Sequence, residues 1–150
     1  MVVVDIGCGS WCRGDIGIDL NPFSGKKSPH LDRFVGYTRN PECMLVVADA
    51  HMLPLRSGIA DVVLMIHILE HLECPPCALR EVVRVLKRGG RLIVEVPNPC
   101  KNRADWIDHT HLHSYTEASL SNVLRYVGLD VEVVIYAHYS DDIQTRAIKR

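Results

Sequence analysis

Short apolar runs recur along the chain, and most contain no alternation of apolar with polar residues. A strand with one face in water would alternate, so runs of this kind are typical of strands buried on both faces of a parallel sheet. Segments with a helical period between several runs would supply the cover. The sequence therefore predicts a doubly wound α/β fold with a mostly parallel, seven-stranded sheet. The runs expected to be parallel are Val2–Ile6, Ile16–Leu20, Met44–Ala48, Asp61–Ile66 and Arg91–Val96.

The remaining elements follow from spacing and from turn residues. Leu129–Tyr139 and Ile143–Lys149 are separated by a short polar turn, so we expect a hairpin and hence an antiparallel edge of the sheet. Apolar residues at the helical period predict a helix over Pro76–Lys87. A second helix is expected from Thr116, its cap, to about Val127. Leu31–Tyr37 is expected to form one or two helical turns.

The connection between the first two predicted strands is unusually short. Only residues 7–15 separate them, whereas a parallel crossover normally takes about a dozen residues and a helix. An extended segment of that length spans the strand at ~3.3 Å per residue, but it has no residues left for a helix. This shortening would expose one face of the sheet and the mouth of any pocket there. Residues 21–43, a substrate or a second copy of the chain would then cover them, and we expect a homodimer.

Composition excludes several classes of protein. A length of 150 residues corresponds to one domain, residues 1–150, with a core of its own. The formal net charge of −1 does not indicate a protein held to nucleic acid mainly through phosphates, although local basic patches leave such a partner open. Membrane partners are not expected, because no apolar run approaches the ~20 residues that cross a bilayer. The first residues lack the features of a signal peptide, so we expect a cytoplasmic protein.

The six cysteines are expected to be mostly reduced, since a cytoplasmic chain with this much core needs no disulfide framework. Cys74 and Cys77 form a single Cys-x-x-Cys, which is half of a zinc site. We favour ordinary residues at the start of a helix over the alternative, a redox-labile disulfide.

Glycine and acidic residues follow three of the predicted strands. Gly7 and Gly9 would turn the chain sharply after the first, and Asp19 and Asp49 end the next two. Each alone has a plain explanation, as a tight turn or a solvated strand end. Because the carboxyl ends of parallel strands share one edge, together they predict a nucleoside pocket. The third glycine of a dinucleotide motif is missing, with Trp11 in the turn that follows Gly9, and carboxylates suit a cationic ligand better than a pyrophosphate.

At these residues the chain resembles the class I S-adenosylmethionine-dependent methyltransferases, specifically the small type 11 group. The resemblance covers almost the whole chain, and the order and spacing of its last two blocks make it specific. The blocks are Val3–Gly9, Gly17–Leu20, Ala48–Leu55, Asp61–Leu72 and Leu79–Leu92.

The resemblance implies a Rossmann-like methyltransferase that uses S-adenosylmethionine as its cofactor and acts on an unidentified acceptor. By the same resemblance His67 contacts the methionine end or the substrate. The alternative is a non-catalytic binding module or partner subunit, and an oxidoreductase is disfavoured by Trp11 and the missing helix. The other implied cofactor contacts are Asp5, Gly7 and Gly9 for the methionine part, Asp19 for the ribose, and Asp49 and Ala50 for the adenine.

Histidines form the last candidate group. His67, His111 and His113 are the candidates for a general base, which is needed only if the acceptor must lose a proton. Alternation would aim His109, His111 and His113 to one side of an extended segment, with Tyr115 nearby. The alternative is a hydrogen-bonded loop. We expect no metal, because the zincin order His-Glu-x-x-His is absent and no second ligand set is visible.

Overall fold

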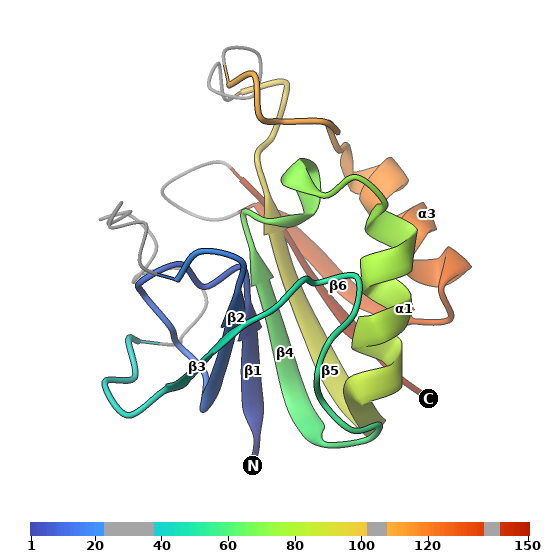
Figure 1. Ribbon diagram of the computed structural model, residues 1–150. Helices are drawn as coiled ribbons and strands as arrows, with labels where there is room; N and C mark the ends of the chain where they lie inside the picture. The colour runs from blue at the N-terminus through green and yellow to red at the C-terminus, as the bar shows by residue number, and fades with distance from the viewer. Residues whose placement is uncertain (23–37, 102–107, 137–141) are drawn as a thin grey trace.

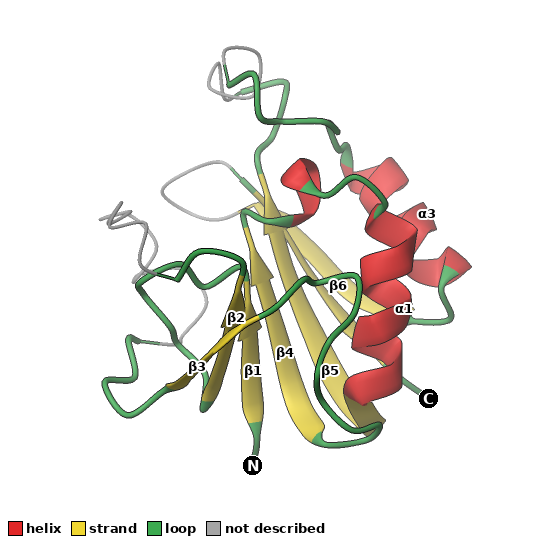
Figure 2. Ribbon diagram, viewed as in Figure 1, coloured by secondary structure: helices red, strands yellow, loops and turns green. Residues whose placement is uncertain are grey.

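The computed structural model describes residues 1–22, 38–101, 108–136 and 142–150, and it contains one seven-stranded sheet (Figures 1 and 2). The order of the strands is β3-β2-β1-β4-β5-β7-β6. The predicted fold class is confirmed, including the antiparallel edge. The strands are β1 (Val3–Ile6), β2 (Ile16–Asp19), β3 (Met44–Val47), β4 (Ala60–Ile66), β5 (Leu86–Val96), β6 (Asp130–Tyr136) and β7 (Ile143–Ile148).

The order of the strands creates a switch point beside β1. Strands β3, β2, β1, β4 and β5 are parallel, and the chain runs outward from β1 to β2 and β3 before it returns to β4 on the other side. Ligands of open α/β sheets bind in the crevice at such a point, at the carboxyl ends of the strands. Strand β7 lies antiparallel between β5 and β6 and closes the other edge.

Three short helices are present in the described residues: η2 (Leu69–His71), α1 (Pro75–Val85) and α3 (Glu117–Tyr126). Helix α3 begins with the expected cap, because the Thr116 hydroxyl accepts from Ser119 N and the Ser119 hydroxyl accepts from Thr116 N. Helix α1 is shorter than predicted, and β5 begins at once at Leu86. None of the described helices is long and apolar enough to cross a membrane.

Both α-helices pack on the same face of the sheet. The main core joins Leu79 and Val82 of α1 and Leu120 of α3 to residues such as Val63 and Val94 of the central strands. A second, smaller cluster lies on the opposite face of the sheet, and it contains no residue of a described helix. Helical cover of this second face, which a doubly wound sheet predicts, is therefore not found within the residues described. The expected helical turns at 31–37 lie outside them. The second cluster consists of Val3, Val62, Leu64, Ile66 and Ile93.

The first crossover is as short as predicted, and it contains no helix. Its backbone is held by the strand it leaves: Arg13 N donates to Asp5 Oδ2 at 2.8 Å, and Asp15 Oδ2 accepts from Val3 N at 2.8 Å. Asn40, from the segment before β3, donates from its side chain to Gly14 O at 3.1 Å. Hydrogen bonds of the loop thus hold this crossover against the sheet, whereas the packing of α1 holds the connection between β4 and β5.

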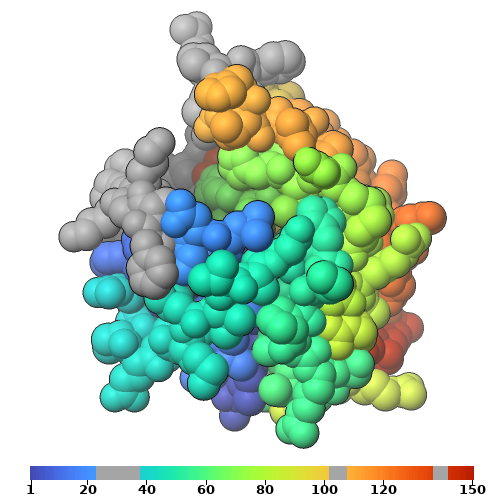
Figure 3. Space-filling view, in the orientation of Figure 1, coloured from blue at the N-terminus to red at the C-terminus, as the bar shows by residue number. Residues whose placement is uncertain are grey.

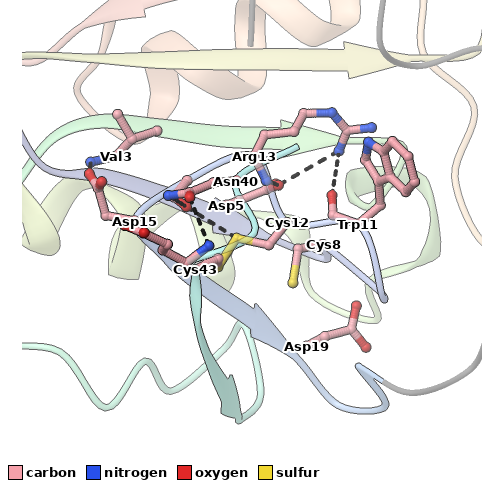
Figure 4. Close-up of a disulfide and its surroundings, with 12 residues drawn as sticks. Val3, Asp5, Cys8, Trp11, Cys12, Arg13, Asp15, Asp19, Asn40 and Cys43 are labelled. Atoms are coloured by element: carbon pink, nitrogen blue, oxygen red, sulfur yellow. Dashed lines mark hydrogen bonds and ion pairs between the residues drawn. A yellow bond between two sulfur atoms is a disulfide. The ribbon is translucent and has the colours of Figure 1, made fainter. Parts of the chain in front are cut away.

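The expectation of mostly reduced cysteines is wrong for four of the six, since Cys12–Cys43 and Cys74–Cys77 are disulfides. The reason for the first pair is topological. Cys12 precedes β2 and Cys43 precedes β3, and because these strands are parallel neighbours their amino ends lie side by side. Figure 4 shows the bond there, between the crossover and the segment before β3. The second pair forms at the start of α1, where ordinary helix residues were favoured.

Candidate functional site

A cavity of about 160 Å³ lies at the switch point, at the carboxyl ends of β1 and β2. In Figure 3 the surface is hollowed here, between the residues that end β2, the segment that follows β4, and the loop 108–113 above them. The walls formed by the described residues are apolar except for one carboxylate. The lining residues are Ile6, Gly7, Ile18, Asp19, Leu20, Ala48, Ala50, Ile68 and Leu72. Three of the predicted cofactor residues, Gly7, Asp19 and Ala50, are among them.

Gly7 is required by its surroundings as well as by its backbone. Its φ is +73°, a region that L-residues rarely adopt, and its N–H donates to Ile18 O at 2.7 Å. A Cβ at this position would meet the side chain of Ile68 at 2.6 Å. Gly9 also has a positive φ, +52°, but nothing lies within 4 Å of the place of its Cβ. The glycine turn therefore lets the segment after β4 pack directly on the end of β1.

Among the described residues that line the cavity, Asp19 alone carries a charge. One carboxylate oxygen accepts from Gly9 N at 2.7 Å, and the other accepts from Asn21 N at 2.7 Å. These bonds hold the carboxylate at the end of β2, in the position that the sequence predicted. Each oxygen keeps a further lone pair for a ligand.

Asp5 does not line the cavity. It is buried on the face of the sheet that carries Val3, where its carboxylate accepts from Arg13 N and lies 3.6 Å from the Arg13 guanidinium (Figure 4). Burial raises the pKa of Asp5 to about 6, although the hydrogen bond and the charge of Arg13 lower it in part. Asp5 therefore positions the crossover and does not reach the cavity.

Asp49 is exposed beside Ala50, which lines the cavity. Its carboxylate accepts from His51 N at 2.8 Å and contacts His51 Nδ1 at 2.6 Å. These contacts hold the pKa of Asp49 below its usual value. The predicted adenine segment thus lies at the rim of the cavity, with its acidic side chain held by a neighbour.

His67 lies outside the cavity lining, among three buried carboxylates. It has a φ of +51° and is the only residue other than glycine with a positive φ in the described chain. Its Nδ1 lies 3.4 Å from Glu70 Oε1, and its Nε2 lies 3.4 Å from both Glu95 Oε1 and Asp142 Oδ2. Burial alone would lower the pKa of His67, but Asp142, Glu70 and Glu95 outweigh burial and raise it well above the usual value. Both ring nitrogens thus face acceptors.

The sequence does not predict Glu95 and Asp142 as partners of His67. A signal was present for Glu95, which interrupts the apolar run Leu92–Val96 at the end of β5 and is fully buried there. Its Oε2 accepts from the Gln144 side chain at 3.0 Å, across the β5–β7 pair. A charged residue in the interior of a buried strand needs a partner. The position of Glu95 therefore indicates a cationic or hydrogen-bonding neighbour, which in the structure is His67.

The loop 108–113 rests on η2 rather than on the cavity. Leu112 N and His113 N both donate to Glu70 O, at 2.8 and 3.1 Å. The His111 ring contacts the His71 ring with centroids 4.7 Å apart, whereas His113 lies beside Tyr115 at 6.3 Å. His109 is exposed. The three histidines do not share one side, because residues 109 and 110 form a turn instead of extended chain.

Comparison with known proteins identifies the family to which this chain is similar. A family model described as a methyltransferase domain matches residues 16–94. The chain is 32% identical over 98 residues to the tRNA (carboxymethyluridine(34)-5-O)-methyltransferase ALKBH8 of Macaca fascicularis, covering 63% of this chain and 14% of that protein. It is 30% identical over 145 residues to the ajmaline N-methyltransferase of Rauvolfia serpentina, covering 87% of this chain and 45% of that protein.

Solved structures agree on the fold. One contains the Trm112 methyltransferase activator of Haloferax volcanii in complex with a protein described there as a methyltransferase. It matches with a TM-score of 0.74 at 18% identity, over 97% of this chain and 81% of that one. The chain spans less than half the length of each of the two curated relatives named above.

Proposed function

The chain belongs to the type 11 family of S-adenosylmethionine-dependent methyltransferases, and from this premise we propose that it binds S-adenosylmethionine in the cavity and methylates an acceptor. When bound, this cofactor would supply a methyl group on a sulfonium: the acceptor's nucleophile would bond to the methyl carbon in line with the carbon–sulfur bond, which breaks as the neutral thioether leaves. The chain's own task is then to hold donor and acceptor in a dry, aligned arrangement, and such alignment is worth up to ~7–11 kcal/mol.

The cavity suits the nucleoside part of the cofactor. Its apolar lining would accept a purine, and the carboxylate of Asp19 would accept hydrogen bonds from the two ribose hydroxyls. At about 160 Å³ it is smaller than the ~300–1,000 Å³ of sites that enclose a whole ligand of drug size. The methionine part would therefore extend past Gly7 and Gly9 toward the segment that begins at His67.

The observation that carries the proposal is the carboxylate of Asp19, fixed by two backbone N–H groups at the wall of an apolar cavity. Around it we propose Asp49 and Ala50 for the adenine edge, and the glycine turn for the methionine part. Asp5 acts as a positioning residue through Arg13, because it is buried away from the cavity.

We propose His113 as the proton acceptor where the methyl acceptor must lose a proton. Its Nε2 is buried without a hydrogen-bond partner, although the loop that carries it rests on η2 and does not line the cavity. The ring of His67 faces carboxylates at both nitrogens, so it serves better to hold Glu70, Glu95 and Asp142 together than to take a proton.

Calorimetric titration with S-adenosylmethionine tests the proposal. Wild type is expected to show saturable binding, with none for NAD. Asp19→Ala is expected to abolish it, and Asp19→Asn to weaken it at least about tenfold, because an amide nitrogen cannot accept from a hydroxyl. The matched control is Asp130→Asn on the edge strand β6, which should bind as wild type does. Thermal unfolding of each variant separates lost binding from lost folding.

Two outcomes would contradict the proposal. Micromolar affinity retained by folded Asp19→Ala would remove the pocket assignment. No binding by wild type to either ligand would favour the alternative from the sequence, a non-catalytic module that works through a partner.

A homodimer remains part of the proposal. Within the described part of the chain the edge strand β3 pairs with β2 alone, and its residues Met44, Leu45 and Val47 are 65%, 40% and 64% exposed. Apolar side chains on an unpaired edge favour association with another strand. Light scattering after size-exclusion chromatography should give twice the 16.9 kDa chain mass, and a Val47→Lys variant should run as a monomer.

A further inference from the structure

A second group of polar side chains lies behind the cavity wall, between η2 and the loop 108–113. Glu70, His71 and His111 each present one ligand atom, and these three atoms lie within 4.8 Å of one another. None of the three residues lines the cavity, although Ile68 and Leu72 of the same segment do. The cluster is therefore separate from the proposed cofactor site but shares its wall.

The carboxylate of Glu70 is the unexplained feature of this cluster. The residue is 1% exposed, and neither carboxylate oxygen has a hydrogen-bond partner. Its nearest imidazole nitrogens are farther away, at 3.4 Å from Oε1 to His67 Nδ1 and 3.9 Å to His71 Nε2. A carboxylate withdrawn from water without hydrogen bonds is costly, and carboxylates buried in this way usually pair with a charge or coordinate a metal.

His71 is oriented as a metal ligand is. Its Nδ1 lies 3.1 Å from the carbonyl oxygen of Thr110 and 3.1 Å from the Thr110 hydroxyl, which itself donates to Asp108. A carbonyl only accepts, so Nδ1 carries the proton and Nε2 keeps its lone pair, on the side of Glu70. A histidine that binds metal through one nitrogen commonly donates from the other to a carbonyl or carboxylate, which fixes its tautomer.

The loop that supplies the third ligand is fixed in place before any ion binds. Its backbone is joined to η2 by the bonds from Leu112 and His113 to Glu70 O, and Asp108 Oδ2 stands 3.8 Å from His111 Nε2. Metal bonds to nitrogen and oxygen are about 2.0–2.2 Å long, so ligand atoms of a tetrahedral ion lie about 3.4 Å apart. The present separations need side-chain rotations only.

We propose that Glu70, His71 and His111 bind one divalent transition-metal ion of the Zn²⁺ class. Two imidazoles and one carboxylate are a common ligand set for such an ion, and they leave a coordination position open. The neighbouring group of His67, Glu95 and Asp142 fits less well, because both nitrogens of His67 already face carboxylates. The ion would tie the loop 108–113 to η2 and neutralise Glu70.

The test uses the full chain with its disulfides intact, freed of metal with a chelator and titrated calorimetrically with Zn²⁺. One ion should bind per chain. Glu70→Gln and His111→Ala should each weaken binding at least about 100-fold, since even the loss of a supporting partner of a ligand costs about 10–100-fold. The matched control is His109→Ala, an exposed histidine of the same loop, which should leave the affinity unchanged. Melting curves without metal report whether each variant folds.

Cobalt gives a second readout that identifies the ligands. Co²⁺ bound at this site should absorb as a nitrogen and oxygen complex, without the charge-transfer band of a thiolate such as Cys100. Equal affinity in wild type, Glu70→Gln and His111→Ala, a thiolate band, or no binding by wild type would each overturn the site. Titration with S-adenosylmethionine is separate, so the failure of one proposal is distinguishable from the failure of the other.

Discussion

In the half of the sheet formed by β1, β2 and β3, a loop joins β1 to β2, whereas between β4 and β5 the chain passes through η2 and α1. Helices α1 and α3 bury a large apolar core against the second half. The first half has no described helix of its own. It relies on the Asp5–Arg13 contacts, on the Asn40–Gly14 bond and on the Cys12–Cys43 disulfide.

The difference shows that the ligand site and the main apolar packing lie in different halves of the sheet. The first half supplies most of the cavity lining, and its loops are held by polar contacts that leave the carboxyl ends of β1 and β2 open to a ligand. The second half supplies stability through apolar burial, together with the ionisable cluster around Glu70. Three changes would test this division of labour.

The largest effect is expected from the disulfide that ties the first crossover to β3. The Cys12→Ala/Cys43→Ala variant should lose about 2–4 kcal/mol of unfolding free energy, because the bond closes a loop of 31 residues. The Cys74→Ala/Cys77→Ala variant is the control, since its loop of three residues gives about 2 kcal/mol less by the same loop-entropy argument. Urea unfolding without reductant measures both, and equal losses would contradict the division between the halves.

A pH effect of up to about 3 kcal/mol is expected from Asp5. Its pKa is about 6 in the folded chain and 3.8 in the reference state, so the folded state holds the proton more tightly. The free energy of unfolding should therefore fall as pH rises from about 4 to 6 and change little above that window. The quantity to compare is the free energy of unfolding of wild type minus that of Asp5→Asn at each pH, because the titration of all other groups cancels in this difference. A difference that stays constant over this window would contradict the prediction.

The smallest effect distinguishes the two glycines after β1. Gly7→Ala and Gly9→Ala share a positive φ, which costs each about 1 kcal/mol. Only Gly7→Ala adds a clash with Ile68, so it should be less stable than Gly9→Ala by about 1–3 kcal/mol. Chemical unfolding measures the stability of both variants. In an Ile68→Ala background the clash is removed, so Gly7→Ala should lower the free energy of unfolding by less than it does in the wild type. Equal stability of the two glycine variants would contradict the prediction, because it would mean that the Ile68 side chain moves aside at no cost in stability.

Much of the fold could be predicted because the pattern that encodes it is local. Apolar runs identified the five parallel strands, the short polar turn identified the pair that became β6 and β7, and the Thr116 cap identified the start of α3. The end of α1 was less predictable, because β5 extends back through Gly89 and Gly90. Those residues exchange backbone hydrogen bonds with Lys149, about sixty positions away, and no local signal reports that contact.

The candidate site was predictable only where a residue stands at a strand end. Asp19, Gly7 and Ala50 line the cavity as expected, because the end of a strand fixes their place. The surroundings of His67 were not predictable, since they bring together β5, η2 and the residue before β7. The Cys12–Cys43 disulfide was not predictable for the same reason, because it depends on which strands are neighbours in the sheet.

The place of β7 in the sheet sets an order on folding during synthesis. Strand β6 hydrogen-bonds only to β7, and β7 lies between it and β5. While the ribosome is still making residues 143–148, β6 has no partner and β5 presents an unpaired edge, which is a template for wrong pairing. The second half of the sheet thus closes in one late step, when β7 enters between two strands that were made before it. A chain paused before that step is the form most exposed to aggregation.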